Sequence, residues 1–272
     1  MNPDTREVTA RSFVEAVSSV RVRDHRGSAL RLTLAAVHQQ IISCERCPRL
    51  REYCQRIARE KRRAFRHDTY WARPVPGFGD PRARVLILGL APAAHGANRT
   101  GRVFTGDGIG GSGDFLMASL HRAGFANMPT SQHPGDGLRL RDAFIAAAVR
   151  CAPPDNTPTP EEITRCLPHL DSELAALPGV RVVVALGRIA FDAYLQLVRQ
   201  HGLVLRPRPA FAHASILKLP NGHTLIGCYH PSRQNTNTGK LTSRMLNDVF
   251  RKAGRALEPS RARGVQPSVK TR

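Results

Sequence analysis

Four short apolar runs along the chain have the length and composition of buried β-strands. They occupy residues 85–89, 143–149, 182–186 and 224–228. Each run is rich in Val, Ile, Leu or Ala without regular polar positions, which is typical of strands that helices cover on both faces. Segments with helical periodicity flank these runs. The pattern therefore predicts an α/β sandwich with parallel strands.

Helical periodicity is clearest near the two ends of the patterned region. Residues 30–44 form one predicted helix, residues 50–63 continue as a basic helix, a third begins at residue 161, and a final one covers residues 239–256. The folded unit is thus expected to span residues 29–257. The flanking segments, 1–28 and 258–272, are polar or basic and lack a sustained apolar pattern, so we expect both to be flexible.

Basic residues are in large excess. The 41 Lys and Arg outnumber the 21 Asp and Glu, which gives a formal net charge of +20. This excess favours a polyanionic partner such as nucleic acid, although a generally arginine-rich composition would produce it too. The sequence has no apolar run long enough to span a membrane and no export signal, so we expect a cytoplasmic protein.

The six cysteines are expected to be reduced, because no export signal points to an oxidising compartment. Cys44 and Cys47 form a C-x2-C pair, and Cys151 and Cys166 form a second, more widely spaced pair. Four thiolates suit a [4Fe–4S] cluster, and the spacing leaves zinc and incidental core cysteines open as alternatives. The remaining two cysteines are interpreted as small buried hydrophobic residues.

The loop after the first strand is dense in small residues, so its backbone can approach a flat base or a phosphate closely. Phe104 in this loop could stack on a base or plug the core beneath it. Asp107 could orient water or stabilise a sugar cation, or could simply be a turn residue before a glycine. Two cations of the loop, Arg99 and Arg102, are candidate contacts to DNA phosphates.

The loops after the second and fourth strands also carry polar groups at what should be the same edge of the sheet. Asn156 could bind a base or water, or could be a turn former. His230 could donate to a base oxygen as negative charge develops there, or could be structural. Residue types that contact phosphates follow it: Ser232, Arg233, Gln234 and Asn235.

Three long motifs together resemble family 5, the B-type branch, of the uracil-DNA glycosylase superfamily. They read GLAPAAHGANRTGRVFTGDG from residue 89, AAVRCAPPDNTPTPEE from residue 147 and CYHPSRQNTNTGKLT from residue 228. The resemblance covers about residues 38–253. It implies a three-layer α/β/α sandwich around a four-stranded parallel sheet and a [4Fe–4S] cluster. The cluster ligands would be Cys44, Cys47, Cys151 and Cys166.

The same resemblance implies roles for the loop residues. A base flipped out of DNA would stack on Phe104, Asp107 and Asn156 would assist hydrolysis, and His230 would stabilise the leaving uracilate. The base pocket would be lined by Gly89, Ala91, Phe104, Ala147 and His230.

Two departures from other branches of the superfamily bear on activity. Those branches carry a polar or acidic residue just after Gly89, where this chain has Leu90 and Ala91, so we expect Asp107 to replace the water-activating group. They carry Asn at the base-reading position, where this chain has Ala147. The smaller, less polar wall predicts excision of hypoxanthine and other deaminated bases in addition to uracil.

The expected activity is that of a monofunctional DNA glycosylase. Flipping is easiest for a mispaired base, so U·G pairs should be favoured, and water as nucleophile predicts no lyase activity. We expect a monomer that acts on DNA, with a structural cluster. The alternatives are a non-catalytic iron–sulfur nucleic-acid-binding protein, which would be insensitive to Asp107→Asn and His230→Ala, and an electron carrier.

Overall fold

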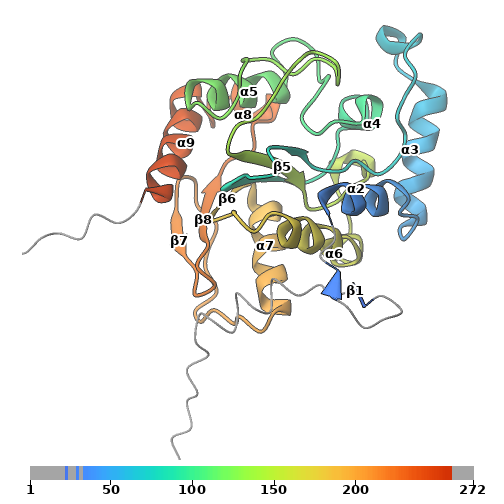
Figure 1. The fold of residues 1–272 in the computed structure, drawn as a ribbon. Coiled ribbons are helices and arrows are strands. Elements are labelled where there is room, and N and C mark those ends of the chain that lie inside the picture. Colours follow the sequence, from blue (N-terminus) through green and yellow to red (C-terminus); the bar gives the residue numbers. More distant parts are fainter. Residues whose placement is uncertain (1–21, 24–28, 31–32, 259–272) are drawn as a thin grey trace, which may run out of the picture.

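The computed structural model describes residues 22–23, 29–30 and 33–258. A six-stranded sheet lies at its centre (Figure 1). Its strands are β3 (Phe78–Gly79), β4 (Val85–Gly89), β5 (Ala143–Ala147), β6 (Val182–Leu186), β7 (Ile216–Lys218) and β8 (Thr224–Cys228). The helices are α2 (Leu34–Ile42), α3 (Pro48–Glu60), α4 (Ala97–Thr100), α5 (Ser112–Arg122), α6 (Pro160–Ala176), α7 (Arg188–Gln200), α8 (Arg233–Asn237) and α9 (Ser243–Leu257).

The strand order is β3-β5-β4-β6-β8-β7. The four central strands are those predicted from the apolar runs, and neighbouring pairs among them are parallel. The sequence analysis missed the two edge strands, β3 and β7, which are antiparallel to their neighbours. Both are only two or three residues long, and β7 is largely exposed, so neither produces a buried apolar run. The prediction of a four-stranded sheet is corrected to six.

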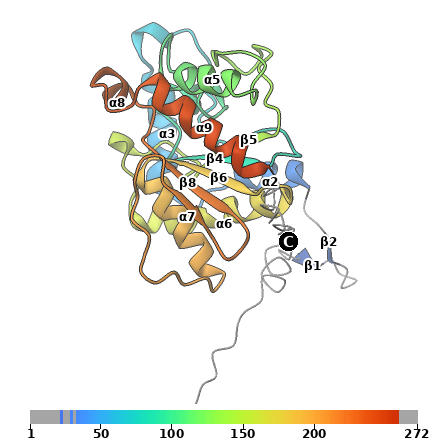
Figure 2. The same cartoon turned by 90° about the vertical axis from the view of Figure 1, so that its left-hand side faces the viewer.

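Helices cover both faces of the sheet (Figure 2). Val85 and Ile87 of β4 belong to an apolar cluster with residues of α5 and α9. Leu86 and Leu88 point to the opposite face and join a cluster with residues of α6 and α7. Because successive strand residues point to opposite faces, burial on both sides requires a continuous apolar strand. The three-layer α/β/α architecture is confirmed.

Local chemistry sets the helix boundaries. α3 begins at Pro48, whose fixed backbone suits a first helical position. α6 begins after a capping box in which Thr159 and Glu162 satisfy each other's backbone N–H groups. α9 begins after its N-cap Thr242, because Gly239 has φ +71° and is not helical. The predicted start at residue 239 is therefore a few residues early.

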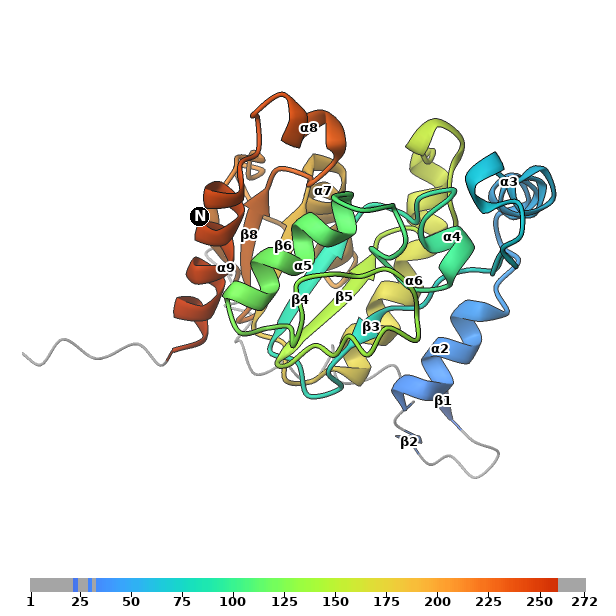
Figure 3. The ribbon, with the colours of Figure 1, turned by 90° about the horizontal axis from the view of Figure 1, so that it is seen from above.

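Much of each predicted flexible segment, 1–28 and 258–272, lies outside the described residues. The described exceptions are Glu258 and the short strand β1 (Val22–Arg23), which pairs antiparallel with β2 (Ala29–Leu30). None of the helices in the described part of the chain is long and apolar enough to cross a membrane. Because β6 and β8 are parallel, the loops that follow them lie at the same end of the sheet, and α8 lies at this end (Figure 3).

Candidate active site and cysteine cluster

Phe104 lies directly over the end of β4. A Cβ atom built on Gly89 would come within 2.9 Å of Cε2 in the Phe104 ring, so only glycine leaves room for this ring. Phe104 itself has φ +50°, an uncommon backbone conformation for a non-glycine residue. Ala147 pairs with Gly89 in the sheet, so the Phe104 ring, Gly89 and Ala147 gather at neighbouring strand ends. The predicted proximity of these three residues is thus observed.

His230 comes to the same place from the end of β8. Its ring centroid lies 6.0 Å from that of Phe104, with the two rings inclined at 32°. Burial lowers the pKa of His230 to about 4, so the imidazole is neutral at physiological pH. Its backbone oxygen accepts a hydrogen bond of 2.8 Å from Nδ2 of Asn235, and Ser232 caps α8. These contacts hold the turn after β8 in place.

Asp107 is packed tightly at the mouth of the loop after β4. A Cβ on Gly96 would fall 1.8 Å from Oδ1 of Asp107, so the carboxyl occupies space that only glycine vacates. Burial raises the pKa of Asp107 to about 6, against the opposing effects of Arg233 and Arg99. Nη2 of Arg233 also donates to the Asp107 backbone oxygen over 3.2 Å. Asp107 is thus a largely desolvated carboxyl beside a cation.

Arg99 and Arg102 hold the loop together from within. Arg99 pairs with Asp68 at 2.6 Å and donates to the backbone oxygen of Gly106 over 2.7 Å. Arg102 is only 6% exposed and is paired with Asp136 at 2.6 Å. The structure gives both guanidiniums an intramolecular role, contrary to the expectation that they contact DNA. The sequence alone does not distinguish an arginine that contacts DNA phosphates from one that forms ion pairs within its own loop.

The other predicted site residues differ in exposure. Asn156 is exposed at the end of a short 3₁₀ helix (Pro154–Asn156), with φ +55°. Arg233 and Gln234 are exposed on α8. Ala91 packs against the apolar cluster that contains the cysteines. Its neighbour Leu90 lines a cavity together with His230.

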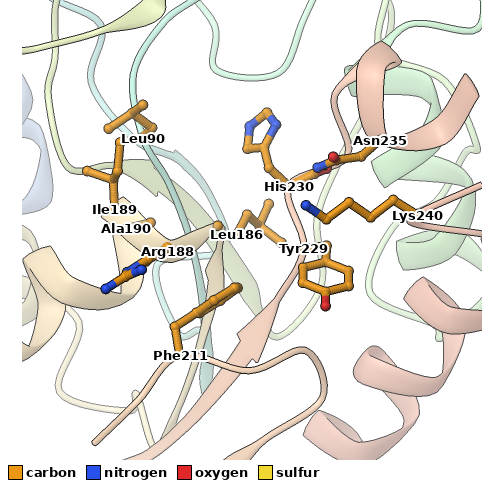
Figure 4. Close-up of a pocket in the computed structure, with 11 residues that line it drawn as sticks. Leu90, Leu186, Arg188, Ile189, Ala190, Phe211, Tyr229, His230, Asn235 and Lys240 are labelled. Atoms are coloured by element: carbon orange, nitrogen blue, oxygen red, sulfur yellow. The ribbon is translucent and has the colours of Figure 1, made fainter. Parts of the chain in front are cut away.

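A cavity of about 480 Å³ opens beside His230 (Figure 4). Leu90 and Ile189 lie across it from Asn235 and Lys240, as Figure 4 shows. Its remaining lining comes from Leu186, Gly187, Arg188, Ala190, Phe211 and Tyr229. The cavity meets the predicted site at His230 and Asn235, while Phe104 and Asp107 lie outside its lining.

Most of the residues that line this cavity were not among the predicted site residues. The apolar run at residues 182–186 predicts a strand end there, but no residue of the loop that follows it is among the predicted site residues. Phe211 belongs to a loop distant in sequence that carries no recognisable pattern, so only the fold could place it there.

Four cysteines pack into one apolar cluster between α3, α6 and the end of β5. Its thiol-bearing members are Cys47, Cys54, Cys151 and Cys166, which we call the cysteine cluster. Cys44 lies near enough to Cys47 and Cys166 to add to the effects that raise the pKa of their thiols, after the larger effect of burial. The four predicted ligands therefore gather in one region, and Cys54, interpreted from sequence as a buried hydrophobe, joins them there. Cys228 is buried elsewhere, in β8.

Basic side chains and two ion pairs surround the cysteine cluster. Arg150 is fully buried and paired with Glu173 at 2.6 Å, and its backbone N–H donates to Sγ of Cys166 over 3.2 Å. Arg49 of α3 pairs with Glu162 of α6 at 2.7 Å and so ties together the two helices next to the cysteines. Burial raises the pKa of the Cys47 and Cys166 thiols, and the nearby guanidiniums of Arg46, Arg150 and Arg165 oppose this effect.

The donor set fits an iron–sulfur cluster in type, because it consists of thiols with a backbone N–H and cations close by. Among the described residues, no group of three or more His, Cys, Asp or Glu side chains is arranged to hold a metal ion. The thiols thus converge without forming a preorganised site for a single ion.

Comparison with known proteins identifies the family of this chain. The sequence profile of the uracil DNA glycosylase superfamily matches residues 76–254. The chain is 50% identical over 222 residues to a type-5 uracil-DNA glycosylase of Mycobacterium bovis, a match that covers 81% of each chain. It is 52% identical over 217 residues to a type-5 uracil-DNA glycosylase of Thermus thermophilus, covering 80% of this chain and 95% of that protein.

A third relative is more distant. The type-5 uracil-DNA glycosylase of Pyrobaculum aerophilum is 42% identical over 214 residues, a match that covers 79% of this chain and 89% of that protein. The matched region includes the loops that carry Phe104, Asp107 and His230. This chain therefore belongs to the uracil-DNA glycosylase superfamily, and within it to the type-5 uracil-DNA glycosylases.

Proposed function

We propose that this protein excises uracil from DNA by hydrolysing the N-glycosidic bond, as the first step of base excision repair. The observation that carries the proposal is the contact between the Phe104 and His230 rings at neighbouring strand ends, with the desolvated Asp107 carboxyl three residues after Phe104 in the same loop. An aromatic ring, a neutral imidazole and a desolvated carboxyl are the groups that base stacking, leaving-group stabilisation and water activation need.

Phe104 is assigned to stacking on the flipped base. Its ring is held against Gly89, and its centroid lies 6.0 Å from that of the His230 ring, so it presents a fixed apolar surface at the strand ends. The positive φ of Phe104 supports this assignment, because strained backbone conformations persist where the surrounding structure enforces them and are concentrated at functional sites.

His230 and Asp107 are assigned to the bond-breaking step. As the bond breaks, negative charge grows on the base, and the neutral imidazole of His230 donates a hydrogen bond to the uracil oxygen. Positive charge grows on the sugar, and the Asp107 carboxylate stabilises it and orients the attacking water. With a pKa of about 6, Asp107 is ionised in most molecules at neutral pH. Asn156 is assigned to fixing a base edge or a water once DNA covers its exposed side chain.

DNA is the proposed partner, with Ser232, Arg233, Gln234 and Asn235 next to its backbone. Arg233 and Gln234 are exposed, and the net charge of +20 attracts a polyanion. U·G pairs are the proposed preferred substrate because a mispaired base is easier to flip. We further propose that the protein acts as a monomer.

The proposed base range extends beyond uracil to hypoxanthine and other deaminated bases. Ala147 is buried and pairs with Gly89 beneath the Phe104 ring, so its methyl group is the only side chain at this wall position. A methyl group imposes no hydrogen-bond requirement on the base edge, whereas an amide there would be left unpaired by a base of the wrong pattern.

A [4Fe–4S] cluster held by Cys44, Cys47, Cys151 and Cys166 is proposed as a structural cofactor. The thiol-only donor set and the surrounding guanidiniums support it, since positive charge offsets that of four thiolates. The cluster would link the segment before α3 to α6 and the end of β5, a joint that the Arg49–Glu162 pair already bridges. It supplies cross-linking of these segments and takes no part in hydrolysis.

Water rather than an amine is the proposed nucleophile, so no lyase activity accompanies excision. Lys240 makes this claim testable, because its side chain lines the cavity beside His230. Its ammonium group lies 5.3 Å from the centroid of the Tyr229 ring. Borohydride added during the reaction should trap no covalent protein–DNA complex. A trapped complex that Lys240→Ala abolishes would overturn this part of the proposal.

The test of the whole proposal is strand scission of an end-labelled duplex with one U·G pair. Incubation with the wild type followed by alkali should cut the strand at the uracil, and His230→Ala should cut it far more slowly. His133→Ala is the matched control, because His133 is an exposed histidine in the loop between α5 and β5. No alkali-dependent cleavage by the wild type would instead favour a non-catalytic DNA-binding protein.

A further inference from the structure

Ile109 is the most exposed large hydrophobic side chain in the described part of the chain. It is 92% exposed, compared with 60% for Val204 and 50% for Ile216. A side chain this exposed stabilises the fold very little, because it removes almost no apolar surface from water. Turn tips ordinarily carry Gly, Asn, Asp or Ser. The fold alone therefore gives no reason for isoleucine at this position.

Ile109 projects from a turn that is held in place rather than from a loose loop. The N–H of Gly111 donates to the backbone oxygen of Gly108 over 2.9 Å, which closes a four-residue turn with Ile109 in its second position. Gly110 has φ +69°, the conformation that a type II turn takes at its third position. The N–H of Gly110 also donates to Oδ2 of Asp114 over 3.1 Å, so α5 anchors the tip.

The turn adjoins both loops of the proposed active site. Ile109 lies two residues after Asp107, whose backbone oxygen accepts a hydrogen bond from Arg233. A Cβ on Gly108 would lie 3.4 Å from Nη2 of the same arginine, so the base of the turn packs against α8. The exposed isoleucine is thus carried at the rim of the site, on the side where the DNA-contacting residues are proposed.

We propose that Ile109 is a wedge that inserts into the base stack of duplex DNA and occupies the gap left by the flipped nucleotide. This inference rests on the proposed function. Apolar side chains inserted between base pairs offset the cost of unstacking, which is a few kcal/mol per step. Isoleucine suits this role because its branched side chain is stiff at χ1, and the anchored turn keeps it pointed away from the protein. A wedge is needed only where a base must leave a stack.

The test compares uracil excision from U·G duplex with excision from single-stranded DNA, under single-turnover conditions. Ile109→Ala should slow excision from the duplex by about tenfold or more and leave the single-stranded rate within about twofold. Ile109→Leu should keep most of the duplex rate. Val204→Ala is the control, because it shortens an exposed aliphatic side chain away from the site. A 2-aminopurine placed next to the uracil should brighten on binding of the wild type and less so with Ile109→Ala.

The outcomes separate this inference from the function on which it rests. Equal duplex rates for the wild type and Ile109→Ala, or equal losses on duplex and single strand, would overturn the wedge while leaving uracil excision intact. Failure of the wild type to release uracil from either substrate would overturn the proposed function and the wedge together.

Discussion

The guanidinium of Arg233 donates to the backbone oxygen of Asp107 over 3.2 Å and so joins the loop after β4 to the helix after β8. The same guanidinium lowers the pKa of the Asp107 carboxyl, against the larger effect of burial, which raises it. One arginine therefore both fixes the relative position of the two loops and sets the proton affinity of the carboxyl between them.

The pH dependence of uracil excision should report this carboxyl. The single-turnover rate should rise as pH increases through about 6, because the ionised form of Asp107 is the one that supports the sugar cation. Because the pKa of His230 is about 4, this side chain stays neutral over the same range and adds no second inflection to the curve of rate against pH. Arg233→Gln should move the acidic limb to higher pH, since it removes the cation that favours the carboxylate. An unchanged limb in Asp107→Asn would assign the titration to another group.

The ionised Asp107 carboxylate, which supports excision, should lower the stability of the folded protein. The pKa of Asp107 is raised from 3.8 to about 6 on folding, so ionising it destabilises the folded state. This cost is absent below about pH 4, grows as pH rises towards about 6 and is complete above it. Asp107→Asn should therefore stabilise the protein by on the order of 2 kcal/mol at about pH 8 and by little at about pH 4.

Thermal unfolding of the wild type and Asp107→Asn at the two pH values measures this difference. Asp155→Asn is the control, because Asp155 is an exposed carboxyl. A lower Tm for Asp107→Asn at high pH would show that the carboxylate is stabilising and that its pKa is not raised.

Iron content should depend on the predicted ligands and not on cysteines elsewhere. Cys166→Ser and Cys47→Ser should lose the visible absorption of an iron–sulfur protein and most of the bound iron. Cys228→Ala should keep both, because Cys228 is buried in β8 within a different apolar cluster. Cys54→Ala is the second control. It should also keep the bound iron, because Cys54 lies in the cysteine cluster without being a predicted ligand. Full iron content in Cys166→Ser would contradict the assigned ligand set.

The range of excised bases should narrow when an amide is added to the pocket wall. Ala147→Asn should lower the excision of hypoxanthine relative to uracil by about tenfold or more, because a polar group left unpaired by the wrong base costs affinity. Ala147→Val adds volume without an amide and distinguishes crowding from hydrogen bonding. Parallel time courses on uracil and hypoxanthine duplexes give the ratio of rates. A ratio that both variants leave unchanged would remove Ala147 from base selection.

The sheet was predictable because its central strands are buried on both faces. Val85–Gly89, Val182–Leu186 and Thr224–Cys228 have the bounds expected from their apolar runs. The edge strands β3 and β7 could not be predicted, because they are short and only partly buried and depend on pairing with distant residues.

The candidate site was predictable as a set of residue types and less so in its details. His230 and Phe104 follow strand ends, so their proximity follows from parallel topology. The sequence could not show that Arg102 is buried against Asp136, because Asp136 lies in the long connection between α5 and β5, whose path the sequence does not predict. Nor could it show that Ile109 is left exposed, since exposure depends on what the rest of the fold leaves uncovered.

Release of free uracil, measured by mass spectrometry with enzyme in excess over a U·G duplex, tests the central claim most directly. The wild type should release the base and leave an intact, alkali-labile strand. Asp107→Asn should do so about a hundredfold more slowly, the scale expected on removing a group that stabilises transition-state charge, while Asp155→Asn matches the wild type. No free uracil from the wild type, or equal rates for the wild type and Asp107→Asn, would contradict the assignment of this site to base excision.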